Sequence, residues 1–207
     1  MAGPMQERVS TDTSRGAAYS RWRREMLDTT AVDLAIRGFQ EIPAPIVLGI
    51  LMEFGYPGAS MSLFADVNAT RVSLLFSNGG GLLGGALHPE VCTTVPPFFE
   101  AAKRCLAHLA PTTSWPVPDA GQVSFYCLTT SGIVTGGALK DDLAEDRHPL
   151  SQLYHAGHEV LTQLRLRAEQ AAAARSAGDR IGKKVCPHCG EDLNVYAVKC
   201  RHCKANL

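Results

Sequence analysis

The sequence carries no excess of charge of either sign. It has 20 basic and 20 acidic side chains among 207 residues, and charged residues make up 19% of the chain. Such a balance argues against a polybasic protein that holds nucleic acid through bulk charge. Disordered chains combine low hydrophobicity with high net charge, whereas 45% of this sequence is hydrophobic. We therefore expect a globular protein with one main domain and a small appendage.

Long apolar segments are also missing. The longest apolar run spans residues 46–52, whereas a helix that crosses a bilayer needs about 20 residues. The first 16 residues are mostly polar and contain no hydrophobic core of the kind found in secretory signal peptides. These absences predict a cytoplasmic protein that is not associated with membranes.

The seven cysteines are unevenly distributed. Cys92, Cys105 and Cys127 stand alone and are expected to be small buried residues. The other four form two Cys-x-x-Cys pairs with ten residues between them: Cys186, Cys189, Cys200 and Cys203. Each pair can form a tight turn with both sulfurs on one side, so two pairs supply four thiolates for a tetrahedral zinc ion. The spacing therefore predicts these four cysteines as zinc ligands.

The segment from Lys184 to Leu207 resembles the short zinc-ribbon modules that are appended to many bacterial proteins. The resemblance rests on the strings CPHCGEDL and AVKCRHC. It departs from the pattern at Lys204, where such modules often have glycine, whereas Gly190 after the first pair suits a left-handed turn. Four thiolates leave no open coordination position, so we expect the zinc to be structural. Two alternatives to zinc are less favoured. Two disulfides would need an oxidising compartment, and a redox-active Cys-x-x-Cys pair would not need a second copy of the motif.

The body of the chain shows alternating and helical hydrophobic patterns. The expected elements are one or two helices over 18–39, a buried strand over 46–52, hairpins over 61–66/71–77 and 122–129/133–139, and helices over 98–109 and 150–177. Two hairpins, each followed by a helix, predict an α+β fold with a mostly antiparallel sheet and helices packed on it. The element order is similar to that of roadblock- and profilin-like folds.

These patterns divide the chain into four parts. Residues 1–17 are expected to be a disordered N-terminus and residues 18–177 an α+β domain. We expect Gly178 to cap the last helix, residues 178–184 to form a flexible link, and residues 185–207 to form the zinc ribbon.

The body contains two groups of residues that could form a site. The glycine-rich segment 78–85 follows a predicted strand, but it lacks the Lys-Ser/Thr of a P-loop and the spacing of a dinucleotide fingerprint. We favour a bend at a sheet edge, where backbones pass closely. His155 and Glu159 are one helical turn apart and could form a metal or acid–base pair. We interpret them, with His148 and His158, as residues on the polar side of an amphipathic helix.

A run of acidic residues precedes this last helix. It lacks the spacing and the glycine of an EF-hand calcium loop, so we expect a solvated loop. Its members are Asp141, Asp142, Glu145 and Asp146.

Together these features predict a non-catalytic interaction or adaptor protein with a structural zinc ribbon and protein partners, among them a second copy of the chain. One alternative is a nucleic-acid-associated protein, because the tail from residue 180 onward has six basic and two acidic side chains. The side chains that would bind phosphate are Lys183, Lys184, Lys199, Arg201 and Lys204. The other alternative is an enzyme that uses the glycine-rich loop with His88 or with the pair His155 and Glu159.

Overall fold

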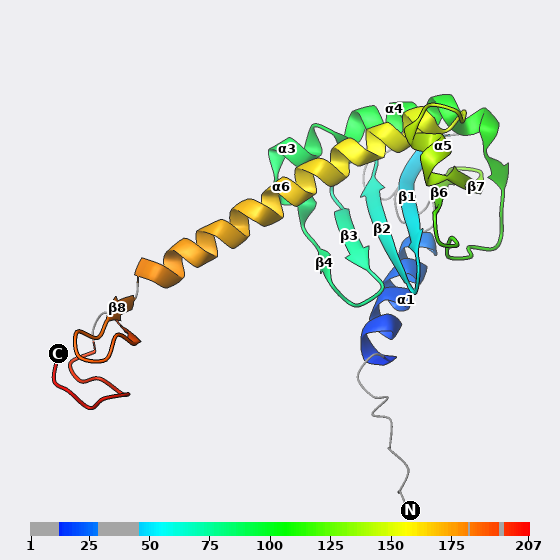
Figure 1. Cartoon of the computed structure of the whole chain (residues 1–207). Helices are drawn as coiled ribbons and strands as arrows, with labels where there is room; N and C mark the ends of the chain where they lie inside the picture. Colours follow the sequence, from blue (N-terminus) through cyan, green and yellow to red (C-terminus); the bar gives the residue numbers. More distant parts are fainter. Residues whose placement is uncertain (1–12, 29–45, 182, 195–196) are drawn as a thin grey trace, which may run out of the picture. The chain divides into compact units, whose positions relative to one another are not determined.

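The protein has an α+β fold with a seven-stranded antiparallel sheet and a C-terminal cysteine cluster (Figure 1). This computed structural model describes residues 13–28, 46–181, 183–194 and 197–207. The chain divides into two compact units, Met1–Leu164 and Arg165–Leu207. The first unit contains the sheet and the second contains the cysteine cluster.

The sheet is built around its most buried strand, β1 (Val47–Tyr56). The strand order is β4-β3-β2-β1-β6-β7-β5. The other strands are β2 (Ala59–Asp66), β3 (Val72–Phe76), β4 (Gly81–Leu82), β5 (Ala110–Pro111), β6 (Gln122–Thr129) and β7 (Gly132–Leu139). The two predicted hairpins are confirmed as β2–β3 and β6–β7, and they flank β1 on opposite sides.

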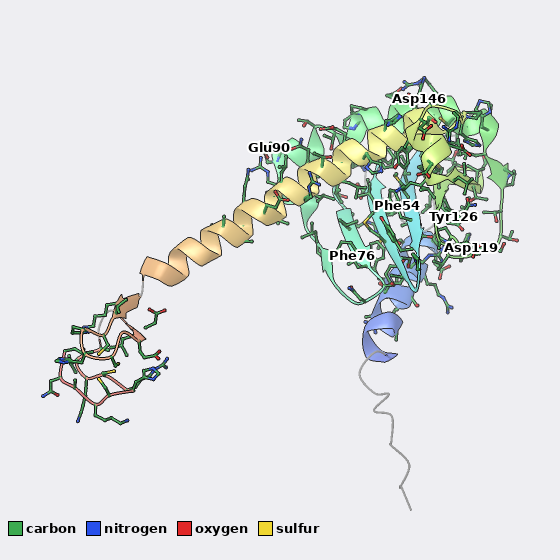
Figure 2. All side chains as sticks on the ribbon, viewed as in Figure 1. Phe54, Phe76, Glu90, Asp119, Tyr126 and Asp146 are labelled. Carbon is green, nitrogen blue, oxygen red and sulfur yellow. The ribbon has the colours of Figure 1, made fainter. Side chains whose placement is uncertain are left out.

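One face of the sheet carries the larger hydrophobic core. In β1 the side chains of Ile50, Met52 and Phe54 point to this face, because successive side chains of a strand alternate. They pack with Phe98 of α4 (Val95–Cys105) and with Leu153 of α6 (Ser151–Ile181). Figure 2 shows side chains filling the space between the sheet and these helices. Each such side chain contributes about 1.5–3 kcal/mol through burial.

Several short elements connect the strands and helices of the first unit. They are η1 (Gly85–Leu87), α3 (Pro89–Cys92), η2 (Leu106–His108) and α5 (Lys140–Ala144). No helix among the described residues is both long enough and apolar enough to cross a membrane.

The opposite face of the sheet is covered by α1 (Thr13–Leu27). Leu27 packs with Leu51 and Phe64 on this face, and the Trp22 ring meets the Phe64 ring edge-on at 6.4 Å between centroids. The central strand β1 is therefore buried on both faces. This burial explains why its sequence is a continuous apolar run rather than an alternating one.

Two predicted boundaries differ from the structure. Residues 13–17, assigned above to the disordered N-terminus, belong to α1. Residues 1–12, and residues 29–39 of the expected helical region, lie outside the described part of the chain.

The last helix is longer than predicted. It continues through Gly178 to Ile181, so Gly178 does not cap it and the first part of the expected flexible link is helical. The run of alanines before Gly178 explains the difference, because alanine is the best helix former and a single glycine costs only about 1 kcal/mol. The two compact units divide within this helix, after Leu164, which is the last buried residue among the helix side chains that the structure describes.

Candidate metal centre

Four cysteine sulfurs lie close together in the C-terminal unit. The Sγ atoms of Cys186, Cys189, Cys200 and Cys203 are all within 4.8 Å of one another. The Cys186–Cys203 and Cys189–Cys200 pairs are each separated by 3.7 Å. This distance is far longer than the roughly 2.05 Å of a disulfide. It matches the edge of about 3.8 Å expected for a tetrahedron with metal–sulfur bonds of about 2.3 Å. The four predicted ligands can therefore hold one metal ion.

Two equivalent turns position these sulfurs. In the first turn the Gly190 amide donates to the carbonyl of Cys186 over 2.9 Å, and in the second the Lys204 amide donates to the carbonyl of Cys200 over 3.0 Å. Gly190 has a φ of 74° and Lys204 a φ of 62°. Both turns thus end in a left-handed residue, which glycine adopts without strain. The prediction for Gly190 is confirmed, and Lys204 adopts the same turn despite its side chain.

A small hairpin supports the first pair of cysteines. Strand β8 (Lys183–Val185) pairs with β9 (Asp192–Asn194) in an antiparallel ladder that leads into and out of the first turn. Leu193 packs with the buried Cys186 and Cys200, and these three residues form the whole buried core of this unit within the described residues. A core of this size cannot hold a fold by itself, so a metal ion held by the four sulfurs would have to supply most of the stability.

Backbone amides favour a thiolate at one of the four sulfurs. The amides of Cys203 and His202 both point to the Cys200 Sγ atom at 3.4 Å. The hydrogen bond from Cys203, followed by that from His202, lowers the pKa of Cys200 to about 6. The thiolate form is the one that binds metal, so this sulfur is prepared for coordination at neutral pH.

The two histidines next to the cysteines, His188 and His202, are exposed. The Nε2 atom of His202 accepts a hydrogen bond from Arg201 Nε at 3.0 Å. His188 lies outside the cluster of ligand atoms.

The strained turn at Lys204 leads to a quantitative prediction. Replacing Lys204 by glycine should stabilise the metal-bound ribbon by about 1 kcal/mol, because a side chain in the left-handed region costs roughly that much. Replacing Gly190 by alanine should have the opposite effect. We expect a chelator competition titration to show about fivefold tighter metal binding for Lys204→Gly and weaker binding for Gly190→Ala. Equal affinities for both variants and the parent would contradict the assigned turn geometry.

The remaining cysteines belong to the sheet domain. Cys105 and Cys127 are buried, and the Cys92 Sγ atom is 3.3 Å from the carbonyl oxygen of Ala86. Burial raises the pKa of Cys127 to about 12, which keeps this group a thiol at neutral pH. The predicted burial is confirmed for Cys105 and Cys127, whereas Cys92 is only half-buried.

Close packing explains the glycine-rich segment 78–85. A Cβ atom on Gly81 would lie 2.6 Å from the carbonyl oxygen of Leu74. A Cβ atom on Gly85 would lie 2.9 Å from the carbonyl oxygen of Val72 and 2.6 Å from a methyl group of Leu164. The segment passes along the sheet edge at β4 and then against α6. The interpretation as a close-packed bend therefore accounts for these glycines.

A pair of substitutions tests this interpretation. Gly85→Ala should destabilise the sheet domain by about 1–3 kcal/mol, because an added methyl group would overpack a filled space. Gly80→Ala is the control, since its Cβ atom would meet only side-chain atoms at 3.3 Å and beyond. Chemical denaturation should show a clear loss for the first variant and little change for the second. If the segment were a ligand-binding loop with empty space beside it, both variants would be as stable as the parent.

The other site candidates each have a separate hydrogen-bond partner or an exposed position. His155 Nε2 lies 3.0 Å from Asp146 Oδ1, whereas Glu159 accepts a hydrogen bond from Gln163. His148 Nδ1 accepts a hydrogen bond from the backbone amide of Leu150. His88 precedes α3 and is exposed.

His158 departs from the expected polar position. It is half-buried, and the centroid of its ring lies 4.3 Å from the ring centroid of Tyr154 and 5.4 Å from that of Phe54. Burial lowers the pKa of His158.

The acidic run contributes exposed side chains and ion pairs rather than a cation cluster. Asp141 and Asp142 lie in the first turn of α5, and Arg147 contacts both Asp142 and Glu145. Among the described residues, the four cysteines are the only group of three or more metal-binding side chains that converge.

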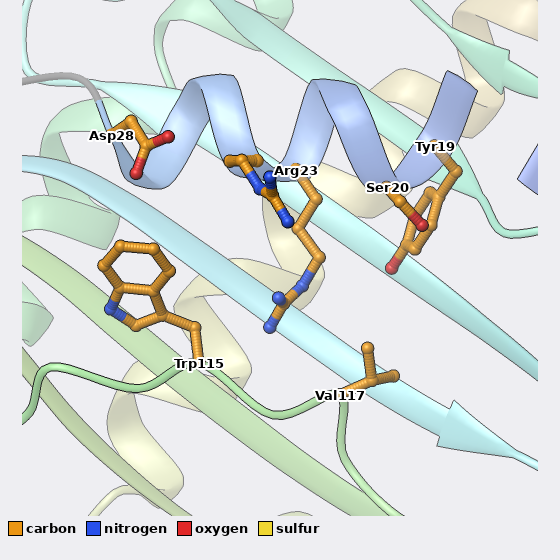
Figure 3. A pocket seen from close by; sticks show the side chains of 7 residues that line it. Tyr19, Ser20, Arg23, Asp28, Trp115 and Val117 are labelled. Atoms are coloured by element: carbon orange, nitrogen blue, oxygen red, sulfur yellow. The ribbon is translucent and has the colours of Figure 1, made fainter. Parts of the chain in front are cut away.

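The sequence analysis did not predict one buried polar cluster, which includes Tyr19 and Arg23 of α1 (Figure 3). Glu53 of β1 has no exposed surface, and Arg23 of α1 binds its carboxylate through Nε at 2.8 Å and Nη2 at 2.6 Å. Ser62 donates to the same carboxylate at 2.6 Å, and Tyr19 bonds to Ser62 at 2.5 Å. Burial, followed by the charge of Glu53, raises the pKa of Tyr19. In the sequence, the sign of this cluster is a single glutamate inside an apolar strand.

Comparison with known proteins returned no relatives: no family model, no curated protein and no solved structure matches this chain. The four-cysteine geometry is compatible with a zinc ribbon. The similarity to roadblock- and profilin-like folds stays a prediction from the order of the elements.

Proposed function

We propose that this chain is a non-catalytic interaction protein of the cytoplasm whose C-terminal ribbon is folded by one structural zinc ion. The converging sulfurs of Cys186, Cys189, Cys200 and Cys203 carry the proposal. Zinc is the ion that most often occupies a closed tetrahedral site of four thiolates. Such a site has no vacant position for a substrate or a reactive water, so the metal would shape a surface and not perform chemistry.

The surface of the ribbon supports a role in binding. Val185 and Val198 are 62% and 78% exposed although both are apolar. Lys199, Arg201 and Lys204 are exposed around the second turn. Apolar side chains surrounded by polar and charged ones are typical of protein interaction sites. A rigid ribbon with this surface would be a recognition element attached to the sheet domain.

The proposal is tested by capturing partners with the full chain. The tagged parent, Cys200→Ser and the control Cys92→Ser would be cross-linked in the native cell and purified side by side. We expect the same protein partners with the parent and with Cys92→Ser, and their loss with Cys200→Ser. Partners that persist without the ribbon would contradict its role in recognition.

Nucleic-acid binding is a second candidate, favoured by the same three exposed basic side chains. The Lys183 side chain lies outside the described residues, and Lys184 is half-buried. A ribbon that contacts phosphates through about three side chains should lose affinity with salt at a logarithmic slope of about −2 to −3. Fluorescence anisotropy with a labelled single strand would measure this slope. Binding that is absent, or insensitive to salt, would remove this candidate.

A further inference from the structure

The four cysteines of the metal centre differ in their exposure. Cys186 and Cys200, the first cysteine of each pair, are buried. Cys189 and Cys203, the second cysteine of each pair, are exposed. Cysteines that oxidants modify combine thiolate character with exposure. A small oxidant would therefore approach the centre at Cys189 or at Cys203.

The charges around the two exposed cysteines are of opposite sign. Cys203 lies between Arg201 and Lys204, and the Lys204 Nζ atom donates to the carbonyl oxygen of Arg201 over 2.8 Å, which holds the ammonium group against the second turn. Cys189 is instead followed by the exposed carboxylate of Glu191. A thiolate that attacks a peroxide expels hydroxide. Nearby cations stabilise this developing negative charge and a carboxylate opposes it, so the surroundings favour reaction at Cys203.

The sulfur that can attack an oxidised Cys203 belongs to the other pair. The Sγ atoms of Cys203 and Cys186 are 3.7 Å apart. The Sγ atom of Cys200 accepts hydrogen bonds from the amides of His202 and Cys203, each at 3.4 Å. Hydrogen bonds that stabilise a thiolate also make it a weaker nucleophile. Cys186 is therefore the better placed partner, and its sulfur would have to approach to about 2.05 Å to form a disulfide.

We propose that the cysteine cluster is a modification site for hydrogen peroxide and other small hydroperoxides, at which Cys203 is oxidised first and Cys186 then forms a disulfide with it. This inference rests on the proposed zinc site. The Cys203 thiolate attacks one peroxide oxygen, the O–O bond breaks, and a sulfenic acid and hydroxide result. The Cys186 thiolate then attacks the Cys203 sulfur and expels a second hydroxide. Two protons from solvent convert both hydroxides to water, so the two thiolates lose the two electrons that the peroxide gains.

The disulfide would remove two of the four metal ligands. Cys189 and Cys200 remain, and two thiolates are too few for a closed tetrahedral site. The site would lose its ion, and the ribbon would lose its fold because its buried core consists of three residues within the described part of the chain. A thiol reductant would restore the thiolates by disulfide exchange. The recognition surface of the ribbon would then exist only in the reduced state.

The experiment follows metal release and disulfide formation in the full chain. The chain is purified with a reductant, its zinc content is measured, the reductant is removed, and one equivalent of hydrogen peroxide is added with a chromogenic zinc chelator. After alkylation of the remaining thiols, trypsin cleaves at Lys199 and Arg201 and so places Cys200 and Cys203 in separate peptides. Mass spectrometric fragmentation distinguishes Cys186 from Cys189.

We expect zinc release together with a bond between Cys186 and Cys203 as the first disulfide. Any other first disulfide, or zinc that stays bound after peroxide, would overturn the proposal. These outcomes differ from a failure of the proposed function. In that case the chain would contain no zinc before peroxide is added, and the proposed metal release would fall with it.

Matched variants test why Cys203 reacts first. Arg201→Gln/Lys204→Gln should slow zinc release by about two- to fivefold, the effect expected for two exposed charges. Lys103→Gln/Arg104→Gln is the control, because it removes the same two charges from exposed positions of α4 in the sheet domain. Its rate should equal that of the parent. Equal rates for both double variants would contradict the role of the basic turn around Cys203.

Discussion

Replacing Cys200 by serine is expected to weaken metal binding strongly and to destabilise the fold of residues 183–207, while the sheet domain keeps its stability. Metal binding contributes about 10–16 kcal/mol to comparable zinc-binding peptides. Loss of one ligand in four therefore corresponds to about 2.5–4 kcal/mol, or a site that is weaker by a factor of roughly 70 to 900. The buried core of this unit consists of Cys186, Leu193 and Cys200 within the described residues, so little else can hold the ribbon together.

Two measurements follow this change separately. Elemental analysis reports the metal content, and thermal denaturation reports the sheet domain, which forms its own compact unit. Cys92→Ser is the matched control, because Cys92 lies in the sheet domain and serine can also reach the carbonyl oxygen of Ala86. Equal metal content in Cys200→Ser and Cys92→Ser would contradict the assignment of the ligands.

Replacing Arg23 by methionine should destabilise the sheet domain by about 3–5 kcal/mol, because it leaves the Glu53 carboxylate buried without its cation. The Arg23 side chain is 11% exposed and that of Glu53 is fully buried. Water can therefore replace little of the lost interaction. The double variant Arg23→Met/Glu53→Leu should recover much of the lost stability. Replacing both members of a buried ion pair by apolar residues costs less than removing one member, which leaves the other charge buried and unpaired.

Urea denaturation followed by tryptophan fluorescence measures this effect, since Trp22 and Trp115 both pack against the core cluster that contains Leu27 of α1. Arg21→Met provides the control. Arg21 lies on the same helix and pairs with Glu25 at the surface, where ion pairs contribute at most about 1 kcal/mol. A loss no larger for Arg23→Met than for Arg21→Met would show that α1 is not anchored through Glu53.

The features that the sequence predicted correctly depend on neighbouring residues. The strands predicted over 122–129 and 133–139 form one pleated hairpin. Similarly, the spacing of Cys186 and Cys189 determines the first metal-binding turn. Such patterns are visible in a single sequence because the interacting residues are close along the chain.

The features that were missed depend on long-range contacts or on competing local preferences. Arg23 meets Glu53 only because α1 packs on the second face of the sheet, and no local pattern indicates which face a helix will cover. At Gly178 the sequence offered a capping signal and a run of alanines, and helix propagation prevailed. A pocket beside Trp115 likewise forms between segments about 90 positions apart in the chain (Figure 3).

X-ray absorption at the zinc edge of the purified chain tests the central claim most directly. We expect one zinc ion per chain, surrounded by four sulfur atoms at about 2.3 Å. A first shell with nitrogen or oxygen in place of sulfur, or a chain that contains no zinc and has its cysteines joined in disulfides, would contradict a ribbon folded around a single four-sulfur site.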